Sequence, residues 1–129
     1  MRAREKRQCS LRYGRTPGRV TGLSATALST TSVRLEWDAP GSDGRKDPAA
    51  RGYFVKGSRR PIRTKRDFSK APNLCRPACT FSIMRVGAKI ILTVTDLRPK
   101  TTYYYKVAAR DNVTHRVGPR SATVRIRTK

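Results

Sequence analysis

Apolar and polar residues alternate over several short stretches of the chain, with turn-forming residues between them. The clearest pair of stretches flanks residues 97–100 (Leu-Arg-Pro-Lys). A period of two is typical of β-strands, because successive side chains point to opposite faces. Pro99 has no amide hydrogen for a strand ladder, so it is expected between the strands. The residues predicted to face a common core are Ile90, Leu92, Val94, Tyr103, Tyr105, Val107 and Ala109.

The rest of the chain shows the same pattern with weaker or shorter runs. Strands are expected near residues 20–27, 33–37, 52–57, 81–84 and 122–127, and polar loops at 41–51 and 111–120. Trp37, the only tryptophan, ends the inward face of its strand, and Tyr53 faces inward on the next. Large aromatic side chains dominate the packing of β-sheet cores. About seven short strands without a long helix predict an antiparallel β-sandwich.

Four ordered motifs make the chain resemble a fibronectin type III domain. They are residues 37–40 (Trp-Asp-Ala-Pro), 52–55 (Gly-Tyr-Phe-Val), 97–103 (Leu-Arg-Pro-Lys-Thr-Thr-Tyr) and 118–121 (Gly-Pro-Arg-Ser). Residues 107–112 are similar to bacterial members of that family. The resemblance implies an all-β fold, a seven-stranded antiparallel immunoglobulin-like β-sandwich with a three-strand sheet on a four-strand sheet.

The resemblance covers residues 18–129 and leaves two segments unexplained. Residues 1–17 are rich in arginine and lysine and are expected to be a basic flexible arm. Residues 58–87, approximately, are expected to be a long insertion. Within the domain, the family assigns Tyr103 to a tyrosine corner, in which the phenol hydrogen-bonds back to upstream backbone. The corner also requires an apolar plug, here Leu97, and a buried hydroxyl that finds a partner.

The charge of the chain is extreme. Thirty lysine and arginine residues against eight aspartate and glutamate residues give a formal net charge of +22. Such a field attracts acidic partners: nucleic acid, anionic polysaccharide or acidic lipid head groups. An arginine-biased genome or a salt-adapted surface would produce the same composition without a specific ligand. No apolar run approaches the roughly 20 residues needed to span a bilayer.

Strand alternation predicts where a polyanion would bind. In the sheet that the family builds from its third, sixth and seventh strands, aromatic and cationic residues share the outward face. Cations suit phosphates or sulfates, and aromatic rings suit stacking. Solvent-facing strand residues are also ordinarily cationic, which is the simpler interpretation. The candidate polyanion-binding residues are Phe54, Lys56, Tyr104, Lys106, Arg125 and Arg127.

Cys75 and Cys79 lie four residues apart, a spacing that can close a small disulfide loop if the backbone turns. A disulfide would indicate an oxidising compartment. Free thiols and a metal site are the alternatives. A zinc site needs four ligands, and the remaining Cys9 and His115 are distant in sequence, so no metal is expected. No glycine-rich phosphate loop is present, so no cofactor is expected either.

Carboxylates are scarce, and none is paired for acid and base chemistry, so the protein is not expected to be an enzyme. Two hypotheses follow. The first is a non-catalytic binding or spacer module of a larger, extracellular or cell-surface bacterial protein, with neighbouring domains and a polysaccharide, cell-surface or protein partner. No secretory signal is present in residues 1–17, so this hypothesis makes the chain a fragment. The second is a cytoplasmic protein that binds nucleic acid or another polyanion.

Overall fold

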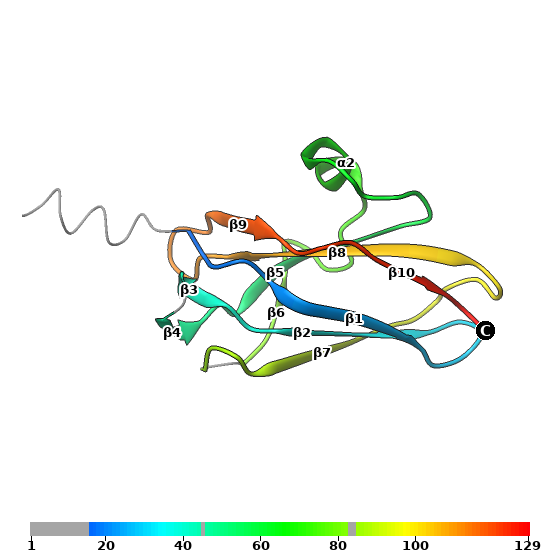
Figure 1. The fold of residues 1–129 in the computed structure, drawn as a ribbon, viewed down its shortest axis with the longest axis horizontal. Coiled ribbons are helices and arrows are strands. Elements are labelled where there is room, and N and C mark those ends of the chain that lie inside the picture. The colour runs from blue at the N-terminus through cyan, green and yellow to red at the C-terminus, as the bar shows by residue number, and fades with distance from the viewer. Residues whose placement is uncertain (1–15, 45, 83–84) are drawn as a thin grey trace, which may run out of the picture.

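Two antiparallel sheets pack face to face in the computed structural model, which describes residues 16–44, 46–82 and 85–129 (Figure 1). One sheet has the order β1-β2-β7 and the other β10-β8-β5-β6, with β9 also paired to β8. The first sheet consists of β1 (Thr21–Ala27), β2 (Val33–Asp38) and β7 (Lys89–Val94). The second consists of β5 (Gly52–Ser58), β6 (Cys79–Thr80), β8 (Thr102–Arg110), β9 (Val117–Arg120) and β10 (Val124–Arg127).

The predicted all-β antiparallel sandwich is confirmed, and the strand count differs from the seven expected. A short hairpin of β3 (Gly41–Asp43) and β4 (Lys46–Ala49) occupies part of the predicted polar loop. Strand β9 lies in the other predicted loop, where Pro119 is compatible with an edge strand. The predicted three-strand sheet, built from the third, sixth and seventh expected strands, therefore has five strands among the described residues, because β6 and β9 extend it, and the sheet that faces it has three instead of four.

The core lies between the sheets and is built by alternating residues. Val33, Leu35 and Trp37 of β2 are fully buried. The Trp37 ring meets Tyr53 and Phe81 edge to face, with centroid distances of 5.4 and 5.9 Å. The Tyr53 hydroxyl donates a hydrogen bond of 2.7 Å to the Ala50 carbonyl oxygen, so this buried polar group is satisfied.

In the corner before β8, the phenol of Tyr103 was expected to donate a hydrogen bond to upstream backbone, but it accepts one instead. The Tyr103 hydroxyl oxygen accepts from the Arg98 backbone N–H at 2.9 Å, and the ring is half-buried. Leu97 packs against the core, and its N–H donates to the Thr31 carbonyl oxygen at 3.0 Å. Alternation then turns Tyr105 inward, where it is almost fully buried.

The two ends of the described chain lie at opposite ends of the long axis (Figure 1). The chain enters β1 at the left of the view and leaves β10 at the right, so β1 and β10 run in the same direction. Pro17, which the sequence places in the flexible arm, is fully buried and lies against Gly118. Residues 1–15 of the predicted arm lie outside the described residues.

Candidate polyanion-binding surface

Residues 59–74 of the insertion cover the outer face of the five-stranded sheet. Helix α2 (Lys65–Lys70) stands above β8 in Figure 1. Ile62 and Phe68 are buried and form a second apolar cluster with Ala108 of β8. Phe54 and Tyr104 pack against this cluster and are partly buried. The sheet face that the sequence predicts to be open is therefore occupied by the chain itself.

Helix α2 begins where a capping box satisfies its free N–H groups. The Thr64 hydroxyl accepts from the Asp67 N–H at 3.0 Å. The Asp67 carboxylate accepts from the N–H groups of Arg63 and Thr64, at 3.0 and 3.2 Å. These N–H groups hold the pKa of Asp67 below its ordinary value. A cap of this kind fixes the start of even a short helix.

Lys56 corrects the prediction of an open cationic face. Its side chain is only 8% exposed, and its Nζ donates to the Ala71 carbonyl oxygen at 3.1 Å. The same nitrogen lies 5.4 Å from the centre of the Phe68 ring. Burial lowers the pKa of Lys56. Phe54, a ring predicted to stack on a bound polymer, is partly buried and packs against the second cluster, so both side chains contact the docked insertion.

The other predicted residues divide into two groups. Tyr104 and Lys106 are half-buried, and the Lys106 Nζ lies 3.4 Å from the Ile62 carbonyl oxygen. Arg125 and Arg127 of β10 are exposed. The six candidates therefore do not form one open surface, although β5, β8 and β10 pair in one sheet as predicted. The apolar insertion residues Ile62 and Phe68, for which the sequence predicted no place on this face, cover part of it.

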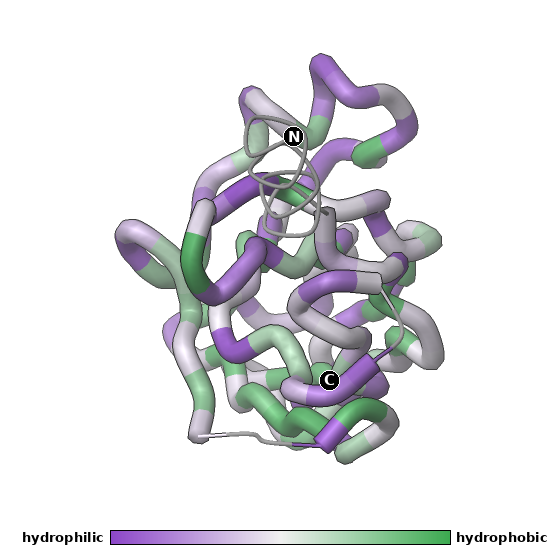
Figure 2. The backbone as a smooth tube through the Cα atoms, turned by 90° about the vertical axis from the view of Figure 1, so that its left-hand side faces the viewer, coloured by the Kyte–Doolittle hydropathy of each residue, from purple (hydrophilic) through white to green (hydrophobic). Residues whose placement is uncertain are grey.

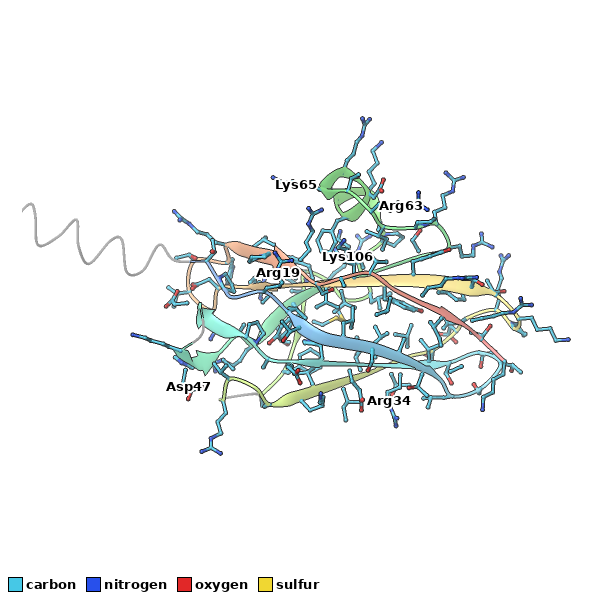
Figure 3. All side chains as sticks on the ribbon, in the orientation of Figure 1. Arg19, Arg34, Asp47, Arg63, Lys65 and Lys106 are labelled. Carbon is cyan, nitrogen blue, oxygen red and sulfur yellow. A yellow bond between two sulfur atoms is a disulfide. The ribbon has the colours of Figure 1, made fainter. Side chains whose placement is uncertain are left out.

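The insertion presents its own exposed cations on the side where the sheet face was predicted to be open. Most residues of the insertion are hydrophilic (Figure 2). Figure 3 shows the side chains of Arg63 and Lys65 extending from it. Asp67 is the only carboxylate in residues 59–74, and it is engaged in the helix cap. The exposed cations, here called the insertion surface, are Arg59, Arg60, Arg63, Lys65, Arg66 and Lys70. The signal in the sequence was this dense basic run around Ile62 and Phe68.

The predicted disulfide between Cys75 and Cys79 is present, with 5.0 Å between the Cα atoms. It lies where the insertion rejoins the sheet, since Cys79 begins β6 and pairs with Tyr53. Neither sulfur is therefore a free thiol or a metal ligand. No group of three His, Cys, Asp or Glu side chains is placed to hold a metal within the described parts of the chain. Cys9 lies outside the described residues.

The buried Asp111 has a structural role. Its carboxylate accepts from the N–H groups of Val113 and Thr114 at 2.8 and 2.6 Å and from the Ser42 hydroxyl at 3.3 Å. These bonds tie the loop after β8 to the β3–β4 hairpin. His115, in the same loop, is exposed. No helix in residues 16–44, 46–82 or 85–129 is long and apolar enough to cross a membrane.

The two packed antiparallel sheets and the tyrosine corner define an immunoglobulin-like β-sandwich. The chain belongs to the fibronectin type III domain family, whose model matches residues 18–127. Domains of this family are commonly non-catalytic binding or spacer modules in multidomain chains. A comparison with curated proteins found no match.

Solved structures with the same fold share little sequence with this chain. The chicken CNTN1 FN1-FN3 domains align with a TM-score of 0.56 and 19% identity, over 86% of this chain and 30% of that chain. The chain thus spans about a third of that three-domain structure. The sixth domain of human fibronectin type III domain containing protein 3 aligns with a TM-score of 0.53 and 21% identity, over 87% and 85% of the two chains. A redesigned β-sandwich protein gives 0.54 and 23%, over 85% and 93%.

Proposed function

We propose that this domain is a non-catalytic binding module of a larger, extracellular or cell-surface bacterial protein, and that its insertion surface binds anionic polysaccharide. The observation that carries the proposal is the insertion surface itself. Its cations are exposed on one segment, and the single carboxylate of that segment is engaged by backbone N–H groups. An anionic chain would therefore meet an uncompensated positive field there.

Docking of the insertion favours binding over simple charge attraction. Ile62 and Phe68 anchor the segment, and the cap at Thr64 fixes the start of α2. The cations thus project from a backbone that is already ordered, so binding does not have to order the segment first. Arginines predominate in this surface, and a guanidinium can donate two parallel hydrogen bonds to one sulfate, phosphate or carboxylate group.

The extracellular setting and the multidomain arrangement rest on separate observations. The Cys75–Cys79 disulfide is typical of proteins that fold in an oxidising compartment. The first and last described segments lie at opposite ends of the long axis, which suits a module placed between neighbouring domains. Nothing in the described part of the chain groups side chains for acid, base or nucleophilic chemistry, and we propose no enzymatic activity.

The test compares binding to a heparin-type sulfated polysaccharide with binding to a neutral polysaccharide, at a series of salt concentrations. We expect binding only to the sulfated polymer, and it should weaken as salt rises. An Arg63→Gln/Arg66→Gln variant should lose most of this affinity. The matched control, Arg125→Gln/Arg127→Gln, removes the same charge from β10 and should lose little. Equal losses would show attraction by net charge alone, and a larger loss in the control would place the site on β10.

A cytoplasmic nucleic-acid-binding protein is the alternative function, and the net charge of +22 favours it. It predicts that affinity for DNA or RNA falls steeply with salt yet persists near about 150 mM, because released counterions dominate such binding. It also predicts reduced cysteines at positions 75 and 79 in the native protein. Nucleic-acid affinity exceeding that for the sulfated polysaccharide at the same salt would overturn the proposal in favour of this alternative.

A further inference from the structure

Three cations from separate segments converge on one pocket beside the insertion. Arg19 precedes β1, Lys106 lies in the middle of β8, and Arg120 ends β9. The pocket has a volume of about 670 Å³. Figure 3 shows Arg19 and Lys106 on the side of the sandwich that carries α2. Because Arg19 lies 101 residues from Arg120 in the sequence, strand alternation alone could not bring it to the other two cations.

Neutral groups, rather than carboxylates, hold these cations in place. The Arg19 Nη1 donates to the Arg120 carbonyl oxygen at 3.0 Å. The Lys106 Nζ lies 3.4 Å from the Ile62 carbonyl oxygen, and the Arg120 guanidinium lies 5.9 Å from the centre of the Phe68 ring. Within the described residues, none of the three cations forms an ion pair, and no carboxylate lines the pocket. Their positive charges are therefore not neutralised locally.

Arg120, one of the three cations, has a buried N–H donor that lacks an acceptor within the described part of the chain. The Nη1 atom of Arg120 is shielded from solvent and has no hydrogen-bond partner among the described residues. A buried charged donor without an acceptor is destabilising. Burial, followed by the neighbouring charges of Arg120 and Arg19, lowers the pKa of Lys106, while Asp67 acts in the opposite direction. The arrangement is one that an added anion would stabilise.

We propose that this pocket binds a tetrahedral oxyanion, which is a sulfate or phosphate group. In the intact ligand this group belongs to the anionic polysaccharide of the proposed function, and this source of the group rests on that proposed function. A carboxylate offers two oxygens in one plane. A sulfate or phosphate group offers oxygens in several directions, so it can accept from Arg19, Lys106 and Arg120 together. The remaining lining includes Gly22 and Ser121, whose small size leaves room for the group.

The test titrates the folded domain with inorganic sulfate and, separately, inorganic phosphate at constant ionic strength. Backbone amide signals of Gly22, Ser121 and Ala122 report on the pocket in two-dimensional NMR spectra. We expect saturable shifts at these amides. Arg19→Gln and Lys106→Gln should each weaken binding about tenfold, because each removes a charged donor. Arg98→Gln, an exposed cation on the corner before β8, should leave the affinity unchanged.

Absence of saturable shifts, or equal weakening by Arg98→Gln, would overturn the site. A heparin-derived tetrasaccharide forms the third arm of the titration. If it competes with inorganic sulfate for the same amides, the bound group comes from a sulfated glycan; competition by phosphate alone would assign the pocket to a phosphate ligand. Salt-dependent binding of polysaccharide without sulfate binding would refute this site and leave the proposed function standing. Sulfate binding without any polysaccharide binding would refute the proposed function and leave the oxyanion site standing.

Discussion

The ammonium nitrogen of Lys56 lies 3.1 Å from the carbonyl oxygen of Ala71, so a residue of β5 donates a hydrogen bond to the segment that covers its own strand. Two backbone bonds continue this connection: the Gly57 N–H donates to Pro72 at 3.2 Å, and the Leu74 N–H donates to Val55 at 3.0 Å. The end of the insertion therefore adds to the sheet edge, and the insertion belongs to the fold.

Phe68→Ala should detach the insertion without unfolding the sandwich. Phe68 is 7% exposed and anchors the second cluster, so its truncation should cost about 2–4 kcal/mol of unfolding free energy. Urea denaturation measures this cost, and hydrogen exchange at the Gly57 and Leu74 amides reports the loss of the edge bonds. Ser69→Ala, an exposed neighbour on the same helix, is the control. Unchanged protection of both amides in Phe68→Ala would contradict the docking role.

Tyr103→Phe should lower the unfolding free energy by about 1 kcal/mol, since it removes the oxygen that accepts from the Arg98 N–H while keeping the ring. The bond is near the surface, where water can reach the N–H, so a larger cost is not expected. The measurement is the urea midpoint at constant slope. Tyr104→Phe provides the matched hydroxyl deletion on the opposite face of β8, and an equal effect there would exclude a special role for the corner.

Acid should destabilise the domain below about pH 4, the usual pKa range of an aspartate. In the folded chain, hydrogen bonds from the Arg63 and Thr64 N–H groups lower the pKa of Asp67. Burial acts to raise the pKa of Asp111, but hydrogen bonds, the one from the Thr114 N–H first, outweigh it, so this pKa is lowered too. Their stabilising contribution is complete above the unfolded pKa and is lost as pH falls through the lower folded values. Urea titrations between pH 5 and pH 2 should show this loss, and Asp111→Asn should flatten the slope.

Reduction of the Cys75–Cys79 disulfide should lower the unfolding free energy by about 2 kcal/mol, because the loop it closes is short. The double variant Cys75→Ser/Cys79→Ser should match the reduced protein. Alkylation without reductant, followed by mass measurement, should label Cys9 alone. Labelling of all three cysteines in freshly purified protein would show that the disulfide does not form.

The sequence predicted those parts of the fold that repeat or carry a motif. Alternation in β2, β5 and β8 is strong because each strand has one face in the core, and the corner motif at 97–103 has its own chemistry. Strand β9 was missed because its four residues include Gly118 and Pro119, which ordinarily mark turns. The β3–β4 hairpin was missed for the same reason.

The candidate site was predicted less well, for a physical reason. Alternation gives the face on which Phe54 and Lys56 lie, but not whether another segment covers that face. The sequence around Ile62 and Phe68 shows no apolar periodicity, and only their tertiary contacts show that they dock on β5 and β8. The cluster of Arg19, Lys106 and Arg120 depends on the same long-range packing and had no local signal.

The parallel course of β1 and β10 has a mechanical meaning. Because the described chain enters at one end of the long axis and leaves at the other, tension applied to its two ends would act along both strands. The hydrogen bonds between β1 and β2 lie across that direction, so they would be strained together in shear and not opened one after another. The insertion stands to the side of this line in Figure 1, so such tension would not act along it.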